Sequence, residues 1–200
     1  MDKVISKAKE LLRELEGLYL KPYKCPVGRW MIGYGDNLEV NGLTVDEVKL
    51  FNFDKTIPIE FITRWQKVGI GTKEIKPVLD QYHKAISISK ATADVLLNNE
   101  VARWVQQLTK CDYFTTAPEN VQIALICICF QCGFKGMSTN IYVDTKPFPW
   151  ANTGQREKKY FINCIIEKDY IRAGGILRAA PIFNSTRRRA ALMADMISGN

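Results

Sequence analysis

The residues best suited to chemistry are one carboxyl group, Glu16, and one thiol, Cys25, which follow each other closely in the chain. Gly17 comes directly after Glu16, and glycine is the usual residue just past a helix because it adopts positive φ without a steric penalty. Cys25 opens the tetrapeptide CPVG, which has the composition of a tight turn. A carboxyl group that is shielded from water can keep its proton near neutral pH, and a thiolate can act as a base or a nucleophile. The pair therefore predicts acid–base or nucleophilic chemistry on one wall of a cleft.

Two local elements must hold these groups. Asp2 can cap a helix that ends at Glu16. Apolar residues recur at helical spacing along it and predict one buried stripe, formed by Val4, Ala8, Leu11, Leu12 and Leu15. The segments 18–23 and 29–35 on either side of the turn predict a β-hairpin.

The return strand carries side chains alternately on two faces. Trp30, Ile32 and Tyr34 fall on one face and suit a core, whereas Met31 and Gly33 fall on the other. Gly33 leaves space there for a ligand or, as an alternative, marks a bulge or a close approach of two backbones.

These residues and their spacing resemble the phage-type (T4-lysozyme-like) lysozymes, a glycoside hydrolase family of endolysin muramidases. The family motif is a helix ending in Glu-Gly, an Asp or Cys in the hairpin turn, and a Thr before Ile-Gly-Tyr-Gly. Here these positions hold Glu16, Cys25 and Met31, and the spacing matches at all three. The family's His after the last Gly is replaced by Asp36. The resemblance is strong over residues 8–51, fair over 87–140 and weak over 176–198.

The resemblance implies hydrolysis of the β-1,4 bond between N-acetylmuramic acid and N-acetylglucosamine in bacterial peptidoglycan, which causes host cell lysis. Glu16 is then the acid that protonates the leaving oxygen. Cys25, a thiol with an ordinary pKa of about 8.5, is expected to activate water or to attack the anomeric carbon. Neighbouring Lys24 and Arg29 favour its thiolate form.

Met31 departs from the family because a thioether cannot donate a hydrogen bond to the attacking water, as the family's Thr does. Three outcomes are expected: a slow enzyme, use of Asp36 as the base, or a protein that binds peptidoglycan without cleaving it. The last is the alternative function, a catalytically impaired wall-binding or structural phage protein on a lysozyme scaffold. Gly33, Tyr34 and Gln131 are the expected substrate contacts. For Gln131 the alternative is an amide that is satisfied within the helix bundle.

The predicted fold class is α+β, lysozyme-like, in a single domain of residues 1–200. Residues 1–88 form a small N-terminal lobe with a β-hairpin sheet and a variable region. Residues 89–200 form a long connecting helix and a mostly helical C-terminal lobe, with the cleft between the lobes. The remaining predicted helices cover residues 44–51, 60–68, 77–85, 90–108, 155–167, 173–180 and 187–196. One more helix opens at 118–119 and has an apolar stretch over 121–132. Residues 138–154 are expected to be a loop insertion.

Composition limits the partners. The formal net charge of +7 favours an anionic partner, and the bacterial wall fits better than nucleic acid, for which no binding motif is present. No run looks long and apolar enough to span a membrane, and the charged N-terminus is not a signal peptide. The resemblance therefore implies a monomer that accumulates in the host cytoplasm, needs a holin to reach the wall, and does not insert stably into the membrane.

The cysteines and the histidine predict no cofactor. Cys129 and Cys132 form a C-x-x-C, but their apolar surroundings indicate a buried helix in which cysteine acts as a small hydrophobe. All six thiols are expected to be free in a reducing compartment. His83 is the chain's one histidine, which excludes a multi-His metal site.

Overall fold

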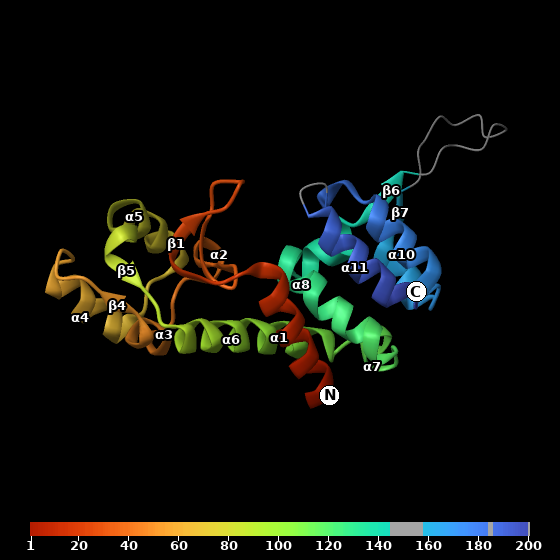
Figure 1. Ribbon diagram of the computed structural model, residues 1–200, viewed down its shortest axis with the longest axis horizontal. Helices are drawn as coiled ribbons and strands as arrows, with labels where there is room; N and C mark the ends of the chain where they lie inside the picture. Colours follow the sequence, from red (N-terminus) through yellow and green to blue (C-terminus); the bar gives the residue numbers. More distant parts are fainter. Residues whose placement is uncertain (145–157, 184–185, 200) are drawn as a thin grey trace. The chain divides into compact units, whose positions relative to one another are not determined.

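The computed structural model describes residues 1–144, 158–183 and 186–199. It is an α+β protein, as predicted, with helices predominating over small antiparallel sheets. The chain forms two compact units (Figure 1). We call Lys9–Glu100 the hairpin unit, and Met1–Ala8 together with Val101–Asn200 the helical unit. The expected division after residue 88 therefore lies within the hairpin unit, and the first eight residues belong with the C-terminal half.

Helix α1 (Asp2–Glu16) and helix α6 (Lys90–Leu108) each contribute residues to both units. The other elements of the hairpin unit are β1 (Tyr19–Lys24), β2 (Trp30–Gly33), β3 (Asp36–Asn37), α2 (Leu38–Asn41), α3 (Val45–Leu50), β4 (Asn52–Phe53), α4 (Ile59–Val68), α5 (Thr72–Tyr82), η1 (His83–Ala85) and β5 (Ile86–Ser87). Strands β1, β2 and β3 form an antiparallel sheet in that order, and β4 pairs with β5. The predicted helix and hairpin are thus confirmed as neighbouring elements of the chain.

Local sequence signals explain where these elements begin and end. Thr44 and Glu47 make a complete capping box at the start of α3, in which each side chain accepts a hydrogen bond from the other residue's backbone N–H. The Ser89 hydroxyl accepts the N–H of Thr92 at 3.0 Å and so caps α6. The core face of the return strand is also as predicted, because Trp30 and Ile32 of β2 and Tyr34, directly after β2, are all buried.

Helix α5 corrects one prediction. The sequence placed a helix start at Pro77, but α5 begins at Thr72 and continues through that proline. Proline lacks the N–H for one helical hydrogen bond, which makes it unfavourable inside a helix. The burial of Ile75 and Leu79 on either side of Pro77 offsets that cost.

The other elements of the helical unit are α7 (Asp112–Thr115), α8 (Glu119–Thr139), β6 (Tyr142–Asp144), β7 (Lys158–Tyr160), α9 (Phe161–Ile166), α10 (Tyr170–Ala179), η2 (Pro181–Phe183) and α11 (Arg187–Ser198). Helices α10 and α11 pack together, and α11 also packs on α8 (Figure 1). The predicted helix over 155–167 is wrong in its described first part, because residues 158–160 form a strand that pairs with β6. Residues 138–139 still belong to α8 and 142–144 to β6, so the expected loop over 138–154 is also wrong there; residues 145–157 lie outside the described residues.

Helix α8 is the core helix of its unit. Leu125, Ile126 and Cys129 are fully buried, as the apolar sequence predicted. Among the described residues, α8 is also the one helix whose length and mean hydropathy of 1.4 would allow it to cross a membrane, which corrects the expectation that no run would. Because 61% of that stretch is buried inside the protein, its apolar character is accounted for by packing. The helix is kinked at Gly133, where φ is 73° and ψ is 163°, directly after the predicted end of the apolar stretch.

Candidate active site

Glu16 is held at the end of a helix that is anchored by its apolar stripe. Val4, Ala8 and Leu12 are buried along α1. Gly17 follows with φ +72°, a backbone conformation that disfavours other residues and that turns the chain toward β1. Glu16 is half-buried, and its carboxyl oxygen Oε1 is screened from solvent. The predicted acid therefore lies at the turn between α1 and β1 with part of its carboxyl group buried.

Cys25 stands in the hairpin turn, as expected. Its N–H donates to the carbonyl of Arg29 at 2.9 Å, and its carbonyl accepts the N–H of Gly28 at 2.8 Å. The thiol is free and half-buried. Lys24 was expected to favour the Cys25 thiolate, but the Lys24 ammonium lies 3.3 Å from a carboxylate oxygen of Asp80. The Lys24 charge is therefore paired with Asp80.

Met31 lies half-buried in β2, where it pairs with Tyr23 on one side and Asn37 on the other. The register thus shows Met31 as a paired residue of the central strand of the sheet, and its effect on an attacking water stays a prediction. Its only heteroatom is a weak acceptor.

Asp36 is buried, with 8% of its surface exposed. The side-chain amide of Asn41 donates to Asp36 at 2.6 Å and to Glu100 at 2.8 Å. Glu100 is also buried. This arrangement ties β3, α2 and α6 together, so it supports a structural role for Asp36 rather than the predicted role as an alternative base.

Gly33 and Tyr34 were expected to touch substrate, but both are buried. A Cβ atom at Gly33 would lie 3.5 Å from the Cβ of Ala93 and 3.7 Å from the side chain of Ile88. The space beside Gly33 is therefore filled by protein. The structure supports a close approach to α6 for Gly33 and a core role for Tyr34, in place of the expected ligand contacts.

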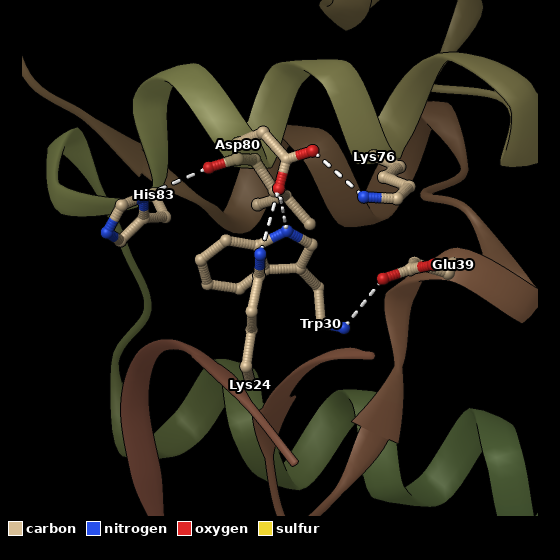
Figure 2. Close-up of polar contacts among 7 residues, drawn as sticks. Lys24, Trp30, Glu39, Lys76, Asp80 and His83 are labelled. Carbon is tan, nitrogen blue, oxygen red and sulfur yellow. Dashed lines mark hydrogen bonds and ion pairs between the residues drawn. The ribbon is translucent and has the colours of Figure 1, made fainter. Parts of the chain in front are cut away.

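A polar cluster that was not predicted from the sequence joins the hairpin to α5 (Figure 2). The carboxylate of Asp80 accepts hydrogen bonds from the Trp30 indole N–H at 2.9 Å and from the Lys76 ammonium at 2.9 Å. The Lys24 ammonium also lies 4.8 Å from the centre of the Trp30 ring. The cluster fastens the two strands that flank the Cys25 turn to α5.

Two further contacts hold Trp30 in place (Figure 2). Its backbone N–H donates to Glu39 of α2 at 2.9 Å, and the His83 ring lies 4.8 Å from the indole ring, centre to centre. The Nδ1 atom of His83 lies 3.0 Å from the carbonyl of Leu79, so His83 is used for packing and one local hydrogen bond. The i,i+4 spacing of Lys76 and Asp80 was the available signal for part of this cluster. No signal in the sequence indicated that Asp80 would pair with Trp30.

The charged form of Asp80 is expected to make the thermal stability of the protein depend on pH. Hydrogen bonds from Lys76 and Trp30 hold the pKa of Asp80 well below its usual range. A carboxylate with a lowered pKa in the folded state stabilises the protein above its unfolded pKa of about 3.9 and loses that effect as the pH falls toward the folded value. We expect Asp80→Asn to lower Tm at pH 6, and the difference from the wild type to shrink below about pH 4.

Thermal unfolding followed by circular dichroism across this pH range measures the effect. Asp46→Asn is the matched control, because the Asp46 side chain is 93% exposed. A difference between wild type and Asp80→Asn that stayed constant down to pH 2 would contradict the assigned role.

Gln131 belongs to the helical unit and lies in α8, just before the kink. Its amide nitrogen Nε2 is buried, and no hydrogen-bond acceptor reaches it within the described part of the chain. Trp104 of α6 is similar, with a buried indole N–H that has no acceptor among the described residues, and its ring would lie 3.7 Å from a Cβ at Gly133. Buried polar groups in folded proteins are usually satisfied. The Nε2 group of Gln131 is thus an exception among the described residues, and its contact with substrate stays a prediction.

Of the two cysteines in the C-x-x-C, Cys129 is fully buried in α8, as predicted, whereas Cys132 is half-buried. Burial raises the pKa of the Cys132 thiol to about 12, and it raises the pKa of Cys129 further. Both thiols are free, and their raised pKa values disfavour the reactive thiolate form at neutral pH. In residues 1–144, 158–183 and 186–199, no three His, Cys, Asp or Glu side chains gather as metal ligands would.

Fold and site together define an α+β protein with a helix-end carboxyl group and a hairpin thiol in one compact unit. No protein-family model matches the chain, and no curated protein matches it either.

Proposed function

We propose that this protein is an endolysin-like muramidase that hydrolyses the β-1,4 bond between N-acetylmuramic acid and N-acetylglucosamine in peptidoglycan. One observation carries the proposal: a helix ends at Glu16 with one carboxyl oxygen buried, and the next two strands form a hairpin with Cys25 in its turn. This local arrangement supports the proposal because it holds a carboxyl group and a thiol in neighbouring elements of the chain. Glycoside hydrolysis commonly needs one group that protonates the leaving oxygen and a second that activates water or attacks carbon.

In this proposal Glu16 donates its proton to the glycosidic oxygen as the C–O bond breaks. Cys25 then acts in one of two ways. As a base, its thiolate takes a proton from the water that attacks the anomeric carbon. As a nucleophile, its sulfur forms a C–S bond, and water later breaks that bond with Glu16 as the base. The first route inverts the configuration at the anomeric carbon and the second retains it.

The test is the release of reducing sugar from purified peptidoglycan, with the new reducing end identified by mass spectrometry. A new N-acetylmuramic acid reducing end supports the proposal. Intact glycan chains after prolonged incubation with folded protein would refute it. Access to the wall through a holin and release from a host cytoplasm belong to the same proposal and depend on that result.

Met31 supports the second candidate, a wall-binding protein with impaired catalysis. Its half-buried thioether occupies the strand position where the family resemblance expects a hydroxyl group. Cosedimentation with peptidoglycan without sugar release would favour this candidate.

The two candidates differ in what Met31→Thr should do. If the rest of the site is sound, a hydroxyl there can orient the attacking water, and we expect turnover to rise by about 10-fold. Met31→Leu is the control, because it keeps the volume and adds no hydroxyl group. Equal rates for wild type, Met31→Thr and Met31→Leu would show that position 31 does not limit catalysis.

A further inference from the structure

Strand β1 contains an irregularity beside the candidate acid. Tyr19 pairs with Gly33, and Tyr23 pairs with Met31, so four steps along β1 match two steps along β2. The extra residues form a bulge that contains Pro22, a residue that lacks a backbone N–H and is tolerated at bulges and sheet edges. Bulges of this kind are frequent next to active sites, where they redirect side chains.

The bulge brings two aromatic rings together. In a regular strand, residues four apart are separated by about 13 Å. Here the ring centres of Tyr19 and Tyr23 are 4.2 Å apart, with an angle of 33° between the ring planes. Tyr19 is 49% exposed, so the pair presents aromatic surface to solvent instead of completing the core.

This aromatic pair lies near two parts of the candidate site. The Tyr19 ring lies 3.8 Å from the position that a Cβ of Gly17 would take, and Gly17 directly follows Glu16. Tyr23 is the cross-strand partner of Met31, which places the two side chains on the same face of the sheet. The rings therefore lie close to the backbone that follows Glu16 and on the same face of the sheet as Met31.

We propose that Tyr19, supported by Tyr23, is a carbohydrate-binding platform that stacks on one N-acetylated sugar ring of a β-1,4-linked glycan. This inference rests on the proposed function for its choice of ligand. A pyranose ring has an apolar face of C–H groups with partial positive charge, and the face of an aromatic ring is negative. The half-exposed Tyr19 offers such a face, and its packing on Tyr23 and against Gly17 limits the freedom that it would lose on binding.

The test measures binding in a Glu16→Gln background, where the proposed cleavage is suppressed. The probes are purified peptidoglycan, by cosedimentation, and a soluble β-1,4-linked N-acetylglucosamine oligomer, by titration. We expect Tyr19→Ala to weaken binding about 10-fold and Tyr19→Phe to change it less than about 2-fold, since the ring is kept. Val27→Ala is the matched control, because Val27 is 80% exposed in the same hairpin and lies outside the aromatic pair.

Unchanged affinity in Tyr19→Ala would overturn the platform. A second measurement guards against misfolding of that variant: the ring protons of Tyr19 in the otherwise unaltered Glu16→Gln protein should shift in NMR spectra when the oligomer is added. No shift at oligomer concentrations that saturate binding would also overturn it. The two proposals separate cleanly. Sugar release without any role for Tyr19 in binding would support the muramidase and refute the platform. Binding that depends on Tyr19, without sugar release by the wild type, would support the platform and refute the muramidase.

Discussion

Replacing Glu16 by glutamine is expected to lower the rate of reducing-sugar release from peptidoglycan by at least about 100-fold. Glutamine is close in size to glutamic acid, but its amide has no acidic proton to give to the leaving oxygen. Position 16 ends α1, and its oxygen Oε1 is screened from solvent, so the amide should occupy the same place with little change in structure. Loss of general acid catalysis should therefore appear in turnover, with glycan binding kept.

The rate is measured on purified peptidoglycan, with binding followed separately by cosedimentation. Glu14→Gln is the matched control, because Glu14 is an exposed glutamate on the same helix. Wild type, Glu16→Gln and Glu14→Gln must have the same circular dichroism spectrum and Tm, so that a difference in rate reports on catalysis. Equal clearing by wild type and Glu16→Gln would mean that the acid has been wrongly assigned.

Substitution of Cys25 is expected to have the second large effect on turnover. Replacing it by alanine removes the only thiol in the hairpin turn, and we expect turnover to fall by about 100-fold, because neither a base nor a nucleophile remains at that position. Cys25→Asp should retain activity, since a carboxylate can act in either role. Backbone hydrogen bonds that involve Cys25, Gly28 and Arg29 define the turn, so these side-chain changes should leave its geometry intact.

The configuration of the first product, followed by NMR, distinguishes the two roles of Cys25. A retained configuration together with a trapped glycosyl–sulfur adduct supports attack by the thiolate, and an inverted configuration supports activation of water. Cys111→Ala is the control, because Cys111 is also half-buried and free but belongs to the helical unit. Full activity in Cys25→Ala would remove Cys25 from the mechanism.

Elements with local signals were predictable. The helix that ends at Glu16, the turn at Cys25–Gly28, the capping box at Thr44 and the long helix 90–108 all appear within a residue or two of the expected bounds. Each is encoded by residues that are close in sequence, through helical periodicity, capping and turn chemistry. The missed strand at 158–160 and the helix through Pro77 had no such local signal, because partner strands and buried neighbours decide those elements.

The candidate site divides in the same way. The sequence alone determined that a carboxyl group ends a helix and that a thiol occupies the following turn, since both depend on a short continuous stretch. Only the tertiary structure decided that Asp36 is tied to Glu100 through Asn41, that Trp30 is fastened to Asp80, and that a bulge stacks Tyr19 on Tyr23. The first two arrangements join residues about 50 or more positions apart, and the third depends on the register between two strands. Such contacts form only when the folded chain brings distant groups together, so no local pattern in the sequence can encode them.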